Sequence, residues 1–355
     1  MKISVGIIGV TGYAGQELLK IVSRHPNVSI GYLAARSLEK ASPVGEILPS
    51  FRTGSDFQNT ANLKIHPFKL SDALNSCKLL FLCLPHGLAM TLAPEILKKP
   101  ETRVIDLSGD FRLTSPKIFK QAYGMRHTSV SFLKNAVYGL SEWARDDLPG
   151  ARWVANPGCY PTATLLALAP LAAAGLLEPD GLIVDAKSGI TGAGRSAKID
   201  LLYSELNENL IAYKVEKHQH TPEMEQLLGR LGKKSIRMTF VPHLVPMDRG
   251  IYATIYAPLK KKLSTKQLRA IFEERYGDEP FIRLLPDKVW PQAKSVAGGN
   301  FCEIGATIDP KGRRAILISA IDNLGKGAAG QAVQNMNIVF GFPETTGLID
   351  SGIGN

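Results

Sequence analysis

In the first half of the chain, short unbroken apolar runs alternate with stretches of helical spacing. The apolar runs cover residues 3–9, 28–35, 79–84 and 103–107, and the helical stretches cover 16–23 and 88–98. An unbroken apolar run is typical of a strand buried on both faces of a parallel sheet. Helices between such strands predict an α/β domain with crossover connections. The stretch between Ser37 and Leu79 is interpreted as a variable loop.

The pattern changes after residue 159. A long apolar run over 163–174 predicts a buried helix. Beyond it we expect strands at 182–187, 235–245, 250–259, 301–308 and 314–321, and helices at 223–231 and 267–275. Such an order predicts a largely antiparallel sheet with helices on one face, and the segment 246–249 is interpreted as a hairpin turn. A last helix over 328–340 has the apolar periodicity of a helix that packs back on the first domain.

The first strand leads into a glycine-rich turn that precedes a helix. The turn is Gly9-Val10-Thr11-Gly12-Tyr13-Ala14-Gly15, with the spacing GxxGxxG in place of the common GxGxxG. Glycines let the backbone approach a pyrophosphate, while the free amides of the helix point at it. The candidate cofactor-binding residues are Gly9, Thr11, Gly12, Tyr13, Ala14 and Gly15.

The end of the second strand indicates which dinucleotide is bound. Enzymes that use NAD place an acid there for the ribose 2′-hydroxyl, whereas this chain has Arg36 and Ser37. An arginine and a serine suit a 2′-phosphate, so we predict NADP; the alternative is that Arg36 is an exposed loop residue.

Two further turns follow the carboxyl ends of expected strands. They are Pro85-His86-Gly87 and Ser108-Gly109-Asp110-Phe111-Arg112. Ligands of open parallel sheets bind at that edge, so Arg112 is a candidate for holding an anionic substrate group, with a surface arginine as the alternative. We assign Ser108 to the same substrate-binding group and Pro85 to the cofactor.

A lone cysteine, Cys159, stands immediately before the long apolar helix. Pro161 fits a first helical turn, so Cys159 is expected beside the unpaired amides of the helix N-terminus. The helix dipole favours the thiolate, which is the nucleophilic form, and Asn156 could donate a side-chain hydrogen bond to an oxyanion. The alternative is a small buried apolar side chain. We favour the acyl-transfer site because the chain also contains histidines that are candidates for its base.

Two histidines are candidates for that base. Thr221 and Pro222 resemble an N-cap and first-turn pair, which would place His220 just before a helix. A cysteine nucleophile needs an acid/base group with a pKa near neutrality, so we choose His220, although His218 lies only two residues away. A second glycine-rich loop, Ser188 to Arg195, is interpreted as either a ligand-binding loop or a flexible connector.

The composition of the chain limits the kinds of binding partner that we expect. The formal charge of +10 is spread along the chain without a nucleic-acid-binding motif, and the longest apolar stretch is too short to cross a bilayer. The four cysteines form no CxxC pair and show neither a disulfide framework nor a zinc-ligand spacing. No leader pattern precedes the first strand, so we expect a cytoplasmic protein. We expect no bound metal. The positive charge of the chain would attract anionic small molecules to the protein.

Seven motifs together resemble the N-acetyl-γ-glutamyl-phosphate reductase family. They are Gly-Val-Thr-Gly-Tyr-Ala-Gly at 9–15, Leu-Pro-His-Gly at 84–87, Asp-Leu-Ser-Gly-Asp-Phe-Arg at 106–112, Asn-Pro-Gly-Cys-Tyr-Pro-Thr at 156–162, Ser-Gly-Ile-Thr-Gly-Ala-Gly-Arg at 188–195, His-Gln-His-Thr-Pro-Glu at 218–223 and Asp-Asn-Leu-Gly-Lys-Gly-Ala-Ala-Gly-Gln-Ala at 322–332. The resemblance spans nearly the whole chain. It implies Cys159 as nucleophile, His220 as acid/base and Asn156 and Arg112 around the phosphate or carbonyl. It also implies Glu223, with Ser108 and His218, near the substrate, and Ser188, Gly189, Gly192 and Asn323 near the cofactor.

The same resemblance implies a fold like that of glyceraldehyde-3-phosphate dehydrogenase. The Rossmann-type domain would comprise residues 1–158 with 326–355, and the catalytic α+β domain 159–325, which would assemble into a homodimer or homotetramer. The implied reaction is NADPH-dependent reduction of an acyl phosphate to an aldehyde through a cysteine thioester, in arginine biosynthesis. Alternatives are a related reductase of a longer, carrier-bound aminoadipyl phosphate, aspartate-semialdehyde dehydrogenase, or an NADP-sensing protein without catalysis.

Overall fold

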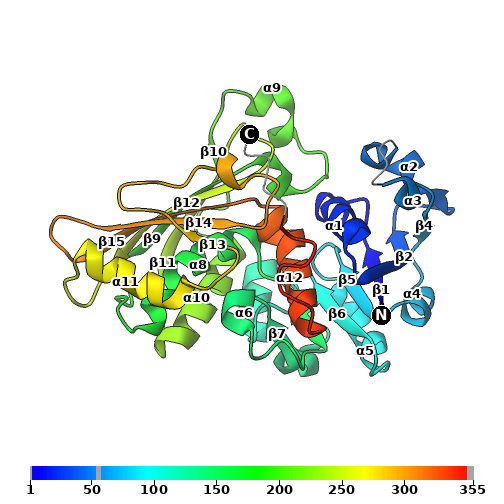
Figure 1. The fold of residues 1–355 in the computed structure, drawn as a ribbon, viewed down its shortest axis with the longest axis horizontal. Helices are drawn as coiled ribbons and strands as arrows, with labels where there is room; N and C mark the ends of the chain where they lie inside the picture. The colour runs from blue at the N-terminus through cyan, green and yellow to red at the C-terminus, as the bar shows by residue number, and fades with distance from the viewer. Residues whose placement is uncertain (1, 53–56, 350–355) are drawn as a thin grey trace. The chain divides into compact units, whose positions relative to one another are not determined.

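The structure, a computed structural model, describes residues 2–52 and 57–349. The chain forms two compact units, one from Met1–Pro157 with Ala328–Ile349 and the other from Gly158–Gly327. Figure 1 labels most of the elements of both units, and the same numbering is used below. No helix among the described residues is long and apolar enough to span a membrane.

The first unit is built on an eight-stranded sheet. Its order is β3 (Ser42–Pro43), β4 (Lys64–Pro67), β2 (Val28–Ala35), β1 (Ile3–Ile8), β5 (Leu79–Leu82), β6 (Arg103–Asp106), β8 (Trp153–Ala155) and β7 (Ala136–Tyr138). All neighbours are parallel except β3 and β4. The central strands are buried on both faces, which explains their unbroken apolar runs.

Helices surround this sheet. They are α1 (Tyr13–Arg24), α2 (Val44–Ile47), α3 (Gln58–Ala61), α4 (Leu70–Ser76), α5 (Ala89–Leu97), α6 (Pro116–Tyr123), α7 (Ser141–Ala144) and α12 (Gly330–Val339). Helix α1 buries Leu18, Leu19 and Val22 on one face and ends before Pro26, because the residue preceding a proline avoids helical geometry. Helix α12, red in Figure 1, packs against α1, α7 and β6.

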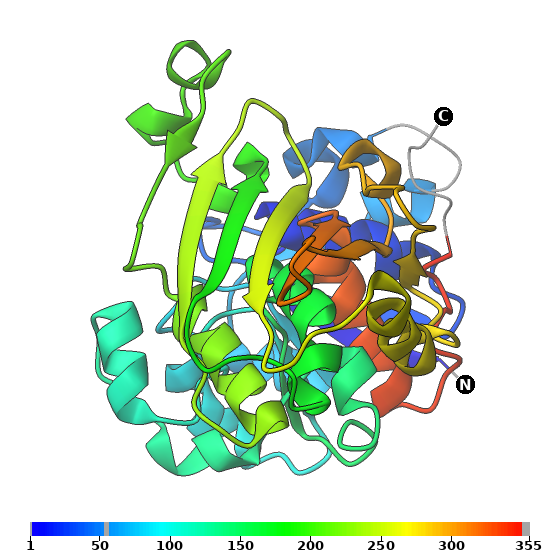
Figure 2. The ribbon, with the colours of Figure 1, turned by 90° about the vertical axis from the view of Figure 1, so that its left-hand side faces the viewer.

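The second unit holds a seven-stranded mixed sheet. Its order is β10 (Ile211–Ala212), β11 (Met238–Leu244), β9 (Leu182–Ser188), β12 (Ile251–Pro258), β15 (Arg314–Ile321), β14 (Cys302–Ile308) and β13 (Ile282–Leu284). Most neighbours are antiparallel, as predicted, but β9 and β11 are parallel, and so are β13 and β14. Figure 2 faces this sheet and shows β11, β9 and β12 side by side.

One long helix organises the second unit. Helix α8 (Cys159–Ala173) is buried along nearly its whole length and contacts β12 and β15 of the sheet. Helix α10 (His220–Gly232) packs on α8, and α11 (Thr265–Tyr276) packs on β14; the short α9 (Tyr203–Leu206) precedes β10. Because α8 is covered all round, it has no exposed polar face, and even its two threonines, Thr162 and Thr164, are buried.

Three predictions of local structure are wrong. Residues 246–249 do not form a hairpin, because β9 lies between β11 and β12 and pairs with both. The expected loop between Ser37 and Leu79 contains β3, β4 and several short helices in its described part. Thr221 is not an N-cap either, since α10 already begins at His220 and its N-cap residue is Gln219.

Candidate functional site

The glycine-rich turn links β1 to α1 in the first unit. Gly9 has φ +92°, and its amide donates to the Ala34 carbonyl at 2.8 Å. A Cβ on Gly15 would lie 2.4 Å from the Gly9 carbonyl oxygen, so only glycine allows this close approach. Gly12 is the N-cap of α1 and has no side-chain cap, and a Cβ there would meet only the Gly9 carbonyl oxygen, at 3.5 Å. The turn thus leaves room for a phosphate beside the first amides of α1.

The other predicted cofactor residues of this unit lie at strand ends. Thr11 is half-buried, while Tyr13 and Ala14 open α1. Arg36 and Ser37 are both exposed directly after Ala35, the last residue of β2. Pro85 is exposed shortly after β5. This distribution along the carboxyl edge of β1, β2 and β5 suits a dinucleotide.

The segment that follows β6 is stabilised by hydrogen bonds to the side chains of Asp106, Ser108 and Asp110. Asp110 accepts hydrogen bonds from the Gly87 amide at 2.7 Å and the Met90 amide at 3.0 Å, so it caps the start of α5. Ser108 is buried, its amide donates to Asp106, and its Oγ accepts from the Asp110 amide. Burial, with the neighbouring Asp110 charge, raises the pKa of Asp106 to about 7.

Arg112 and Asn156 are neighbours in the first unit. The Arg112 guanidinium is buried and donates to the carbonyl oxygens of Asn156 at 2.8 Å and Leu107 at 2.9 Å. The Asn156 side chain donates to the Ala328 carbonyl at 3.2 Å and accepts from Asn335 at 3.1 Å. Both side chains therefore hold backbone in place, and their roles toward substrate stay predictions.

Cys159 is the first residue of α8, as the sequence predicts for the nucleophile. Gly158 is the N-cap, and its amide donates to the Glu223 carboxylate at 2.8 Å. Gly327 lies against the cysteine, because a Cβ there would be 2.9 Å from the Cys159 Cβ. The thiol thus sits at the positive end of a 15-residue helix, where the thiolate is stabilised.

His220 is brought to the same place by α10. It is the first residue of α10, and Glu223 follows one turn later. Residues three apart share a helix face, so the bond from Glu223 to Gly158 turns the His220 side of α10 toward the start of α8. Within the second unit the structure therefore gathers Cys159, His220 and Glu223.

His218 has a different environment from His220. Its Nδ1 accepts the backbone N–H of His220 at 3.1 Å, so that nitrogen carries no proton. Its ring packs against those of Tyr160, Tyr213, His220 and Phe240. Burial, aided by the Lys214 charge, lowers the pKa of His218 to about 3, so the ring is neutral near pH 7. These contacts suit a residue that supports the His220 backbone.

Two tyrosines beside this cluster received no role from the sequence. The Tyr213 hydroxyl donates to the Tyr160 hydroxyl at 3.2 Å, and the Tyr160 hydroxyl donates to the His243 carbonyl at 3.2 Å. Burial raises the pKa of Tyr160 and of Tyr213, and the nearby Cys159 charge raises both further, so both phenols stay protonated. Tyr160 lies inside a recognised motif, whereas no sequence signal marks Tyr213.

The second glycine-rich loop joins the cluster that contains Asn323. Ser188 ends β9, and a Cβ on Gly192 would lie 2.6 Å from Ser188 Oγ and 3.7 Å from Asn323 Nδ2. Asn323 accepts from the Gly250 amide at 2.7 Å and donates to Thr191 Oγ1 at 2.9 Å. The Gly189 amide donates to the Gly250 carbonyl. These hydrogen bonds hold Gly189 and Thr191 of the loop to Gly250 and Asn323.

The other cysteines have unfavourable surroundings for a nucleophile. Burial raises the pKa of Cys77 to about 11 and that of Cys83 to about 12. Cys302 is fully buried in β14, beside Ser319 Oγ. No two of the four form a disulfide, and no group of three metal-ligating side chains occurs in the described ranges 2–52 and 57–349.

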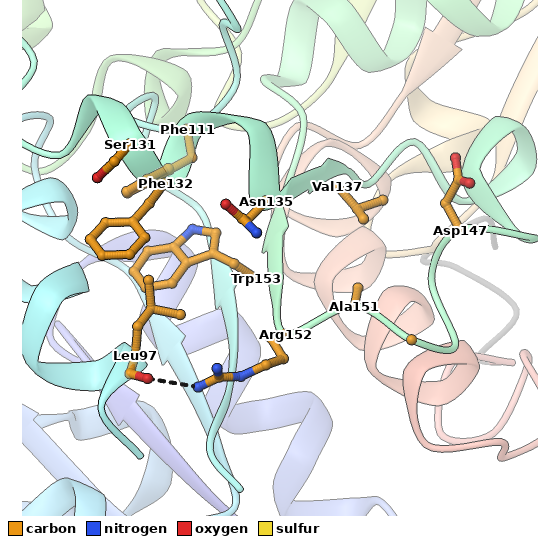
Figure 3. A pocket seen from close by; sticks show the side chains of 11 residues that line it. Leu97, Phe111, Ser131, Phe132, Asn135, Val137, Asp147, Ala151, Arg152 and Trp153 are labelled. Carbon is orange, nitrogen blue, oxygen red and sulfur yellow. Dashed lines mark hydrogen bonds between the residues drawn. The ribbon is translucent and has the colours of Figure 1, made fainter. Parts of the chain in front are cut away.

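A hollow of about 470 Å³ lies near the amino end of β8, as Figure 3 shows. Its lining includes Phe111, Asn135, Arg152 and Trp153, and Arg152 donates to the Leu97 carbonyl. None of the predicted site residues lines it. Because ligands of parallel sheets bind at the carboxyl ends of the strands, this hollow is not the reaction site.

Two family models match this chain, each over a different part of the sequence. Residues 4–151 match a family described as semialdehyde dehydrogenase, NAD binding domain, and 159–323 match its dimerisation domain. An N-acetyl-gamma-glutamyl-phosphate reductase from Symbiobacterium thermophilum is 46% identical over 353 residues, which are 99% of this chain and 99% of that protein.

Solved structures share the fold at low sequence identity. Aspartate semialdehyde dehydrogenase II from Vibrio cholerae, complexed with ASA, has a TM-score of 0.70 at 17% identity and covers 96% of this chain and 98% of its own. Aspartate semialdehyde dehydrogenase with NADP from Candida albicans has a TM-score of 0.68 at 15% identity, with coverages of 96% and 98%. The fold from the structures and the full-length identity from the relative lead to one assignment: the chain belongs to the N-acetyl-gamma-glutamyl-phosphate reductase family of semialdehyde dehydrogenases.

Proposed function

We propose that this protein is an NADPH-dependent reductase that converts N-acetyl-L-glutamyl 5-phosphate to N-acetyl-L-glutamate 5-semialdehyde in arginine biosynthesis. One observation carries the proposal: Cys159 opens α8, His220 opens α10, and Glu223 joins the two helix starts through Gly158. A relative of that name, 46% identical along the whole chain, supports the choice of substrate.

The first half of the reaction is acyl transfer. The Cys159 thiolate attacks the acyl carbonyl, a C–S bond forms, and the C–O bond to phosphate breaks. The departing phosphate takes a proton from His220, and the acyl group remains as a thioester on Sγ. Backbone amides at the start of α8 are suitable donors to the oxyanion that develops on the carbonyl oxygen.

The second half is reduction of that thioester. NADPH, when bound, supplies the hydride that the carbonyl carbon accepts. His220 takes up a new proton from water after the phosphate leaves. It gives that proton to the oxygen and removes it again as the C–S bond breaks, which releases the aldehyde and the Cys159 thiolate. His220 therefore acts as acid and as base in one turnover.

The residues of the first unit fit NADP. Gly9, Gly12 and Gly15 leave space for the pyrophosphate beside α1, with Thr11, Tyr13 and Ala14 around it. Arg36 and Ser37 suit the 2′-phosphate. We assign to the same cofactor Pro85 of the first unit and, from the second unit, Ser188, Gly189, Gly192 and Asn323. The second unit also carries the proposed catalytic residues Cys159 and His220.

We assign the remaining predicted residues to the substrate. Arg112 and Ser108 follow β6 at the carboxyl edge, where an anionic group binds. Asn156 is assigned to the carbonyl. Glu223 and His218 are assigned to the substrate site, where they also accept hydrogen bonds from the amides of Gly158 and His220.

The test is phosphate-dependent reduction of NADP with N-acetylglutamate semialdehyde, run beside its one-carbon-longer homologue. We expect turnover with the first substrate and at least about tenfold lower kcat/KM with the second, since one methylene changes binding by about 1–3 kcal/mol. Preference for the longer aldehyde would favour the aminoadipyl alternative, and no turnover with either would remove the proposal.

Replacing Arg36 by alanine should weaken NADPH binding. A charged hydrogen bond to a phosphate contributes on the order of 1.5–3 kcal/mol, so the KM for NADPH should rise roughly ten- to a hundredfold with kcat little changed. Steady-state kinetics with NADPH and NADH measure this, and NADH serves as the control because it lacks the 2′-phosphate. Equal wild-type use of both cofactors would contradict the prediction.

We further propose a cytoplasmic homodimer. The match to a dimerisation domain over 159–323 supports assembly through the second unit. Exposed apolar side chains of that unit offer the surface: Ile183, Ile199, Leu202, Tyr203 and Leu210. A reductase that consumes NADPH and forms no disulfide suits the cytoplasm.

A further inference from the structure

Asn335 is a buried amide in the middle of α12. It has no exposed surface, and asparagine is a poor helix former, so its cost must be offset by hydrogen bonds. Its Nδ2 donates to the Gly139 carbonyl at 2.8 Å and to Asn156 Oδ1 at 3.1 Å, and its Oδ1 accepts from Ser141 Oγ at 2.7 Å. Both amide hydrogens are therefore used.

The direction of these bonds follows from the groups at the two ends. A backbone carbonyl can only accept, so the Asn335 atom beside Gly139 must be the nitrogen. Its second hydrogen then requires an oxygen on Asn156, which turns the Asn156 nitrogen toward the Ala328 carbonyl. Asn335 and the Ala328 carbonyl thus require the same orientation of the Asn156 amide, and together they hold both of its polar atoms.

The bonds form a continuous chain that begins and ends on one segment. Gln331 Nε2 donates to Ser141 Oγ, Ser141 donates to Asn335, Asn335 donates to Asn156, and Asn156 donates to Ala328. Gln331, Ser141 and Asn335 have no exposed surface, and Asn156 is 1% exposed. Hydrogen bonds aligned in this way strengthen one another in a low-dielectric interior.

Asn156 is held at its backbone as well. Its amide donates to the Asp106 carbonyl at 2.9 Å, and its carbonyl accepts from Arg112 Nε at 2.8 Å. With the two side-chain bonds, four polar groups of this residue are bound. Only Pro157 and Gly158 separate it from Cys159, and Pro157 has a restricted φ. A fixed Asn156 therefore anchors, within the first unit, the short connection that leads to Cys159.

We propose that Asn335 is a positioning residue for the reaction: through Asn156 it anchors the short connection that leads to Cys159. The proposal rests on the proposed function for its effect on turnover, whereas its effect on the Cys159 thiol is independent of the substrate. Nucleophiles must keep their geometry closely, and a displacement of about 1 Å can lower the rate about a hundredfold.

The test compares Asn335→Ala with Asn337→Ala in the full-length protein. Asn337 is an equally buried amide of the same helix, but it bonds to His25, Glu344 and Thr346 and not to Asn156. We expect Asn335→Ala to lower kcat about 10- to 100-fold with KM for NADPH unchanged, and to slow iodoacetamide labelling of Cys159. Asn337→Ala should leave both rates little changed at a similar loss of Tm. Equal effects of the two variants would overturn the proposal.

A double-mutant cycle identifies the route of the effect. If Asn335 acts through Asn156, Asn335→Ala should change kcat and labelling by less than about twofold in an Asn156→Ala background; full additivity would overturn the proposal. Should Asn335→Ala be unfolded, Ser141→Ala replaces it in the same cycle. If the wild type fails to turn over the semialdehyde, the proposed function fails, while the Cys159 labelling rates still decide the role of Asn335.

Discussion

Replacing His220 by asparagine (His220→Asn) is expected to lower turnover by about 10²–10⁴-fold, the usual size of general acid–base catalysis. His220→Asn removes the group that protonates the leaving phosphate and the carbonyl oxygen, yet it keeps a polar side chain at the start of α10. NADPH affinity should change little, because His220 is not among the residues proposed to bind the cofactor. The pH–rate profile should lose its near-neutral limb, which steady-state kinetics between pH 5 and 9 would measure.

His218→Asn is the matched control. The pKa of His218 is lowered to about 3 by burial, so its protonated form is absent near neutrality and cannot produce that limb. The variant should be milder, acting through the bond that His218 Nδ1 accepts from the His220 amide. A larger loss in His218→Asn, with the near-neutral limb retained in His220→Asn, would reverse the assignment.

Cys159→Ala should have the largest effect, a loss on the order of 10⁴–10⁶-fold in kcat, because no covalent route remains. Cys302→Ala is the control, since Cys302 is buried in β14 and should keep wild-type turnover. In the wild type, iodoacetamide at neutral pH should modify Cys159 before the other three thiols. Burial raises the pKa of Cys77 and Cys83 to about 11 and 12, which leaves them almost wholly protonated.

Mass spectrometry of tryptic peptides against residual activity measures the order of modification. Loss of activity should follow the Cys159 label in time. Faster labelling at another cysteine, with full activity in Cys159→Ala, would make Cys159 a packing residue.

The local sequence pattern alone determined many of the strands and turns of this protein. Strand β2 occupies the predicted 28–35, and β15 the predicted 314–321, because burial on the sheet selects apolar side chains directly. The glycine turn before α1 and the cysteine at the start of α8 were also predictable, since each depends on neighbouring residues alone.

Tertiary structure decided the rest. The segments β11 and β12 look like a hairpin in sequence, yet β9 pairs between them, and strand order depends on packing that no local pattern records. Helix α10 begins at His220, earlier than the expected Thr221 cap, where the His218 ring accepts the first amide of the helix. The hydrogen bond from Asn335 to Asn156 joins residues 179 positions apart in the chain, and the sequence around either residue does not predict this pairing. Only folding brings such donors and acceptors together, because their pairing is enforced by burial and not by sequence proximity.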